Sequence, residues 1–292
     1  MIELLSPVGD FECLMAAVQN GANSVYFGSS SFSARAFAHN FDLDELEKVI
    51  KYAKLRGVKT NLTLNTLIKD SEFEDALFLS QKAYEFGIDA IIVQDLGLAI
   101  KLINQFPDLP IHGSTQMSIH NLNGVLQLQD LGFKRVVLSR ELSFSEIEYI
   151  ASHTDIEIEC FAHGALCISY SGQCLFSSMI GGRSGNRGKC AQPCRLPFEL
   201  LKENEKIDSG YLLSTRDLCS LEDIPKFISS GVNCLKIEGR MKSPNYVATV
   251  TRIYRKYIDL ALSCKDFIVE EKDKKELLQV FNRGLSSTRS FK

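Results

Sequence analysis

Four cysteines lie close together in this chain of 292 residues, in the pattern C-x6-C-x15-C-x3-C. No Asp or Glu occurs between residues 160 and 198, whereas four basic residues do: Arg183, Arg187, Lys189 and Arg195. Thiolates are the natural ligands of soft metal centres. A metal bound by four thiolates is anionic, so it repels carboxylates and tolerates nearby Arg or Lys. This segment is therefore the best candidate for chemistry, through Cys167, Cys174, Cys190 and Cys194.

The spacing bears on which metal these thiols bind. Structural zinc sites usually pair ligands about two to four residues apart at both ends of the motif, and here only Cys190 and Cys194 are that close. Iron–sulfur clusters accept wider spacings, and four thiolates suit a 4Fe–4S cluster. We therefore predict a 4Fe–4S cluster, with structural zinc as the alternative. Cys219 is the substitute considered for the fourth ligand in place of Cys194, and the remaining cysteines fit packing positions: Cys13, Cys160, Cys234 and Cys264.

Composition sets limits on the class of protein. The net charge of −3 excludes a chain that is basic throughout, so any contact with nucleic acid must come from a local patch. The N-terminus lacks the features of a signal peptide, and no apolar run approaches about 20 residues. We therefore expect a cytoplasmic protein without a membrane partner, with reduced thiols rather than disulfides.

Short apolar runs alternate with amphipathic stretches along the chain, as in repeated βα units. The predicted strands cover residues 2–5, 24–27, 59–64, 90–93, 109–112, 135–138, 156–161 and 233–237. The predicted helices cover residues 11–19, 43–55, 72–85, 96–105, 121–131, 145–152 and 246–262. Eight such strands predict an α/β fold, a TIM-like (β/α)8 barrel. A doubly wound open sheet is the alternative, but no G-x-G-x-x-G follows the first strand.

The barrel is predicted to span residues 1–262, with a cysteine-rich insertion at residues 163–210 after the seventh strand. Residues 263–292 form a charged tail with a helical pattern. The insertion follows the carboxyl end of a strand, which is where the active sites of such barrels lie. A long connection inside a compact domain is usually functional.

Polar residues follow several predicted strands, and most of them are expected to be solvated rim residues. Arg140 and Arg240 stand out, because a planar guanidinium binds carboxylate or phosphate with two hydrogen bonds. His163, just before the first cysteine of the motif, is a candidate to bind substrate or to donate to the cluster. The predicted catalytic candidates are Arg140, Glu141, His163, Glu238 and Arg240.

The stretch EIECFAHGALCISYSGQCLFS, at Glu157–Ser177, resembles the signature of peptidase family U-32, the collagenase-like family. RGKCAQPCR at Arg187–Arg195 fits the continuation of that signature. Further matches are LLSPVGD at Leu4–Asp10, LSRELS at Leu138–Ser143 and LKIEGRMKSPNYVATV at Leu235–Val250. The resemblance covers essentially residues 1 to 284, and its cysteine motif is highly specific.

The resemblance implies an oxygen-independent hydroxylase rather than a proteolytic enzyme. It implies a 4Fe–4S cluster on the four cysteines, tRNA as substrate, 5-hydroxyuridine as product, and prephenate, a small dicarboxylate, as the hydroxyl source. Ribosomal RNA and ubiquinone precursors are other acceptors in the family. The alternatives are a collagenase-like peptidase and a non-catalytic iron–sulfur subunit paired with a paralogous partner.

The C-terminus departs from the family pattern. Members normally continue after F-N-R-G into a further region, whereas this chain ends eight residues after Gly284. The resemblance therefore predicts that a C-terminal region is missing. If that region helps to bind RNA, the chain alone is expected to be inactive.

Overall fold

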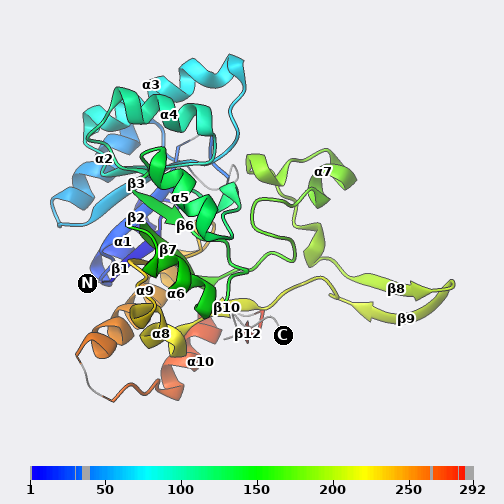
Figure 1. Ribbon diagram of the computed structural model, residues 1–292. Coiled ribbons are helices and arrows are strands. Elements are labelled where there is room, and N and C mark those ends of the chain that lie inside the picture. Colours follow the sequence, from blue (N-terminus) through cyan, green and yellow to red (C-terminus); the bar gives the residue numbers. More distant parts are fainter. Residues whose placement is uncertain (1, 30, 35–39, 264–265, 282, 287–292) are drawn as a thin grey trace.

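The computed structural model describes residues 2–29, 31–34, 40–263, 266–281 and 283–286 (Figure 1). Parallel strands follow one another in chain order from β1 to β7, and β11 pairs with both β7 and β1. That double pairing closes the sheet, so the predicted TIM-like barrel is confirmed and the alternative of an open sheet is wrong. The barrel strands are β1 (Glu3–Pro7), β2 (Ser24–Gly28), β3 (Lys59–Leu64), β4 (Ala90–Val93), β5 (Ile111–Gly113), β6 (Arg135–Val137), β7 (Glu157–Gly164) and β11 (Cys234–Ile237).

Helices cover the outside of the barrel, and their apolar faces pack on the strands in one continuous core. Capping residues fix their ends: Asp42 forms a capping box with Glu45, and Gly87 closes its helix with a positive φ of 83°. The helices are α1 (Phe11–Gln19), α2 (Leu43–Lys54), α3 (Phe73–Phe86), α4 (Leu96–Gln105), α5 (Leu122–Asp130), α6 (Phe144–Ser152), α8 (Ile224–Ser229) and α9 (Pro244–Leu262). None of the described helices is both long and apolar enough to cross a bilayer.

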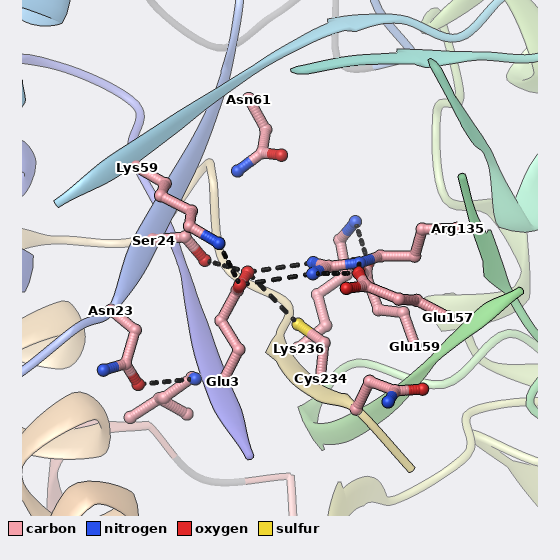
Figure 2. Close-up of polar contacts among 12 residues, drawn as sticks. Glu3, Asn23, Ser24, Lys59, Asn61, Arg135, Glu157, Glu159, Cys234 and Lys236 are labelled. Atoms are coloured by element: carbon pink, nitrogen blue, oxygen red, sulfur yellow. Dashed lines mark hydrogen bonds and ion pairs between the residues drawn. The ribbon is translucent and has the colours of Figure 1, made fainter. Parts of the chain in front are cut away.

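The inside of the barrel is polar at the amino ends of the strands. Arg135 is 5% exposed and contacts the carboxylates of Glu3, Glu157 and Glu159 at 2.8, 2.6 and 3.4 Å (Figure 2). Lys236 on β11 contacts the other oxygen of Glu159 at 2.8 Å. Because buried charges are costly unless paired, these residues form one mutually dependent network.

The chain leaves the barrel after β7 and returns at β10 (Asp217–Cys219), which pairs antiparallel with β7. We call the intervening residues 165–216 the cysteine segment. It holds α7 (Phe176–Gly181) and the hairpin of β8 (Phe198–Lys202) and β9 (Glu205–Gly210), which extend away from the barrel (Figure 1). Short 3-10 helices lie here and elsewhere, at Asp70–Glu72, Thr115–Met117, Gly185–Arg187, Pro193–Arg195 and Leu221–Asp223.

The predicted tail contains α10 (Glu271–Val280) and the short strand β12 (Leu285–Ser286), which pairs with β10. Asp273 on α10 accepts hydrogen bonds from Lys256 and Tyr257 on α9, both at 2.7 Å. The described part of the tail is thereby attached to the barrel. Cys264, predicted as a packing residue, lies outside the described residues.

Candidate active site and metal centre

A cavity of about 320 Å³ opens at the carboxyl ends of the barrel strands. Its floor includes Tyr26 on β2, Thr63 on β3 and Phe161 on β7, and the cysteine segment supplies its outer wall. Active sites of barrels lie at this end, and a cavity of this size holds a small organic molecule. This cavity is therefore the candidate active site.

The four thiols of the predicted metal site all line this cavity: Cys167, Cys174, Cys190 and Cys194. All four are free, and the first and third are exposed. Burial raises the pKa of the Cys194 thiol, Arg195 lowers it, and the three other cysteines raise it again. The fold thus places all four thiols of the motif in the lining of one cavity.

Cys219 lies elsewhere. Its Sγ is 4.0 Å from the hydroxyl of Tyr254, and it does not belong to the described lining of the cavity. The geometry therefore groups Cys194, not Cys219, with the other three thiols. Cys13, Cys160 and Cys234 are fully buried, which confirms their predicted packing roles.

The donor set agrees in kind with an iron–sulfur cluster, because it is all thiol, free of disulfides and lies beside basic residues. Among the described residues, no three Cys, His, Asp or Glu side chains are close enough to share a metal ion. The four sulfurs must therefore draw together to hold a cluster.

The described lining of the cavity is strongly cationic. It has one acidic side chain, Glu238, and six basic ones: Arg140, Arg195, Lys236, Arg240, Lys242 and Arg283. Burial, followed by the charge of Arg283, lowers the pKa of Lys242 to about 8. A site with this charge favours anionic ligands.

Arg140 and Glu141 fasten the cysteine segment to the barrel. Arg140 donates from Nη1 to the carbonyl of Ala165 at 3.1 Å and from Nε to the hydroxyl of Ser171 at 3.4 Å. The Glu141 carboxylate accepts from the backbone N–H and the hydroxyl of Ser171 at 2.9 and 3.0 Å. Glu141 faces a second, adjoining cavity, where its other oxygen is 3.3 Å from Nε2 of His120.

Basic residues of the motif also form hydrogen bonds and ion pairs within the chain. Arg187 donates to Glu72 at 2.6 Å and to the carbonyl of Leu67 at 2.9 Å. Arg195 donates to the carbonyls of Leu166 and Thr215. Arg183 donates to the carbonyl of Lys189, and Lys189 itself is exposed. Three of the four basic residues of the motif are thus engaged within the chain.

A family model and several curated relatives match this chain. The model of peptidase family U32 matches residues 9–291. The chain belongs to peptidase family U32. Among the relatives of this U32 chain is the 23S rRNA 5-hydroxycytidine C2501 synthase of Escherichia coli, which is 41% identical over 88% of the chain. The tRNA hydroxylation protein P1 of Bacillus subtilis is 36% identical over 98% of it, and the collagenase of Porphyromonas gingivalis is 36% identical over 97%.

The U32 chain spans only part of these relatives. It covers 39% of the rRNA enzyme, 70% of the tRNA protein and 72% of the collagenase. The names of these relatives therefore describe proteins longer than the stretch that this chain matches.

In the U32 barrel, His163 lies behind the cavity rather than in it. Burial, together with the charge of Lys242, lowers its pKa to about 3, so the ring is neutral at physiological pH. Its Nδ1 is 3.3 Å from the hydroxyl of Tyr254. Its position suits packing beneath β10, whose Cys219 pairs with it in register.

Sequence reasoning missed Lys236 and the two aromatic rings of the cavity floor. The ammonium of Lys236 lies 4.4 Å from the centre of the Tyr26 ring and 5.5 Å from that of Phe161. A signal was present, because a lysine in the apolar run of a buried strand is rare unless it is paired. The same signal marks Arg135 and Glu159 in their predicted strands.

Proposed function

We propose that this U32 chain carries the catalytic barrel of an oxygen-independent RNA hydroxylase that forms 5-hydroxyuridine in tRNA. A 4Fe–4S cluster on Cys167, Cys174, Cys190 and Cys194 and prephenate as the hydroxyl source complete the proposal. The observation that carries it is a single cavity with four free thiols on one wall and buried cations on its floor. The relatives named for tRNA and rRNA hydroxylation support RNA as the acceptor.

The residues of the chain have distinct tasks in this proposal. When bound, the cluster supplies electron-transfer chemistry beside the cavity. The cationic floor binds the anionic co-substrate, and Lys189 at the rim faces the RNA backbone. Tyr170 lines the cavity and is 65% exposed, so its ring offers a surface on which an unpaired base stacks.

Peptidase activity is the second candidate, because one relative bears the name collagenase. A nucleophilic peptidase needs a nucleophile within hydrogen-bonding reach of a base. No histidine belongs to the described lining of the main cavity. We rank the peptidase second, because more of the relatives are named for RNA hydroxylation than for collagen cleavage.

The metal centre is tested by anaerobic reconstitution with iron and sulfide. Alanine at any one of the four cavity cysteines should remove most of the bound iron, whereas Cys219→Ala serves as the matched control and should keep it. Wild type should bind about four iron and four sulfide per chain. A colourless protein with one zinc, or equal loss in Cys219→Ala, contradicts the cluster assignment.

The reaction is tested by mass spectrometry of nucleosides from tRNA and rRNA incubated with the reconstituted chain and prephenate. The proposal predicts 5-hydroxyuridine in tRNA, and its loss in the cysteine variants. Hydroxycytidine in rRNA would move the acceptor to rRNA. A loaded cluster with no product would favour the non-catalytic subunit, and cleavage of collagen would favour the peptidase.

A further inference from the structure

The described lining of the main cavity contains two lysines that differ in their partners. Lys236 is 5% exposed, and its Nζ donates to the carboxylate of Glu159 at 2.8 Å (Figure 2). Lys242, in the loop between β11 and α9, is half-buried and forms no ion pair with a carboxylate in the described part of the chain. Its lost hydration is therefore not offset by an opposite charge in direct contact, which disfavours the ammonium form.

Aromatic and cationic groups surround Lys242 instead. Its Nζ lies 2.7 Å from the centre of the Phe281 ring and 5.7 Å from that of Tyr246. The guanidinium carbon of Arg283 lies 4.7 Å from the centre of the same Phe281 ring, so two cations share one ring. A lysine that is desolvated and lies beside another cation is the kind that acts as a nucleophile in enzymes, because part of it is the neutral amine.

The charges around Lys242 agree with this geometry. Burial and then Arg283 lower its pKa to about 8, Asp217 and Glu238 oppose that decrease, and Arg195 adds to it. About a tenth of the Lys242 side chains are therefore neutral amines at about pH 7.

The backbone at Lys242 is fixed on both sides. Its N–H donates to the carbonyl of Gly239 at 2.9 Å, and the next residue, Ser243, caps α9 by accepting from the N–H of Tyr246 at 3.3 Å. Gly239 lets this turn pack closely, because a Cβ there would lie 2.6 Å from Cε1 of Tyr246. The turn and the cap thus hold the base of the lysine side chain at the cavity.

We propose that Lys242 is a catalytic nucleophile that forms a Schiff base with the keto group of a small α-keto acid in this cavity. The carboxylate of such an acid suits the cationic lining, and its size suits about 320 Å³. The inference rests on the proposed function in taking prephenate, which has a keto group beside a carboxylate, as the natural keto acid.

The step needs neither an oxidant nor a reductant. The lone pair of the neutral amine attacks the carbonyl carbon, so that a C–N bond forms as the C=O bond breaks. The carbonyl oxygen leaves as water with the two protons of the amine. The imine that results, once protonated from solvent, withdraws electrons from the neighbouring bonds of the acid more strongly than the ketone does.

The test is reductive trapping on the chain at about pH 7 with pyruvate, the simplest α-keto acid, and cyanoborohydride, which converts an imine into a stable secondary amine. The adduct adds the mass of pyruvic acid less one oxygen atom. Peptide mass spectrometry should find it on Lys242 at about tenfold or higher occupancy than on Lys202, which is exposed on the β8–β9 hairpin. Equal labelling of the two lysines, or no adduct on Lys242 with pyruvate, phenylpyruvate or prephenate, would overturn the proposal.

Two variants that keep the charge identify the nucleophile. Lys242→Arg cannot form an imine, so the adduct should disappear while thermal unfolding stays close to that of wild type. Lys236→Arg is the matched control: its guanidinium can still pair with Glu159, so labelling of Lys242 should stay within about twofold. If Lys242→Arg keeps the adduct and a folded Lys236→Arg loses it, the nucleophile is Lys236 and the assignment of Lys242 is wrong.

Hydroxylation of tRNA separates this inference from the proposed function. With the reconstituted chain and prephenate, Lys242→Arg should lower the rate of 5-hydroxyuridine formation about a hundredfold or more. A rate equal to that of wild type would overturn the role of Lys242 while the proposed function stands. If Lys242 is labelled in a chain that hydroxylates no RNA, the proposed function fails and the nucleophilic lysine stands.

Discussion

The barrel interior and the cysteine segment differ in how far their charged, thiol and apolar groups are buried and paired. In the interior, Arg135 is 5% exposed and contacts three carboxylates, so its charge is balanced within the fold. In the cysteine segment the thiols are free, and Met179 and Ile180 on α7 are 83% and 65% exposed. The charges of the barrel interior are thus paired within the fold, whereas the cysteine segment leaves thiols and apolar side chains exposed.

The segment is nevertheless fastened to the barrel at defined points. Ser171 is bound by Glu141, and the neighbouring Gly172 approaches the barrel so closely that a Cβ there would lie 2.5 Å from the carbonyl oxygen of Gln116. Arg187 joins the segment to Glu72 on the far side. Polar contacts therefore position the segment, whereas apolar packing positions the barrel helices.

The largest effect is expected from Arg135→Met. It leaves Glu3 and Glu159 buried beside fewer cations, which should destabilise the barrel by about 3–5 kcal/mol in urea unfolding at neutral pH. Adding Glu3→Gln should restore part of that loss, because it removes one of the unpaired carboxylates. If Arg135→Met lowers the free energy of unfolding by less than about 1 kcal/mol, the barrel interior does not depend on its paired charges, and the contrast with the cysteine segment fails.

Acid should lower the stability of the barrel, because it protonates the Glu3 carboxylate. Burial alone would raise the pKa of this carboxyl, but hydrogen bonds and the charge of Arg135 lower it to about 2. The group therefore stabilises the fold above its ordinary pKa near 4.5, and that stability is lost as pH falls toward about 2. The shift corresponds to about 3 kcal/mol. Urea unfolding between about pH 6 and pH 3 should show this loss in wild type.

Glu3→Gln is the control for that measurement. The variant should be less stable at neutral pH, and its stability should change less with acid because the titrating group is gone. If wild type and variant lose stability in parallel, other carboxylates carry the acid response.

The smallest effect on the barrel is expected from Gly172→Ala, which should act on the cysteine segment alone. Its φ of +78° and its contact with Gln116 both oppose a side chain. Hydrogen exchange at the Ser171 amide, which donates to Glu141, should accelerate about tenfold or more while urea unfolding of the barrel stays nearly unchanged.

Gly57→Ala is the matched comparison. Gly57 also has a positive φ, of +69°, but a Cβ added there would have nothing within 4 Å. It should destabilise the barrel by about 1–2 kcal/mol and leave exchange at Ser171 unchanged. If each variant both destabilises the barrel and accelerates exchange at Ser171, the segment and the barrel unfold as one unit.

Local patterns in the sequence were enough for the eight barrel strands and the cysteine motif, whereas α8 lies in none of the predicted helices. The period of apolar residues predicted the strands, and glycines such as Gly87 marked helix ends. The fifth strand begins at Ile111 rather than Leu109, because Pro110 has no N–H to donate to a ladder. Site residues were harder: Glu141 faces a second cavity, His163 lies behind the first, and Lys236 was overlooked.

By itself, the sequence determined the order of strands and helices and the presence of four thiols in a segment without acids, since both are local properties of the chain. Only the tertiary structure decided that Cys194 rather than Cys219 shares a cavity with the other thiols. It also decided that Lys236 and Arg240 both line that cavity. The reason is closure of the barrel: the pairing of β11 with β1 and β7 fixes which side chains point inward and at what height, and no local pattern encodes that register.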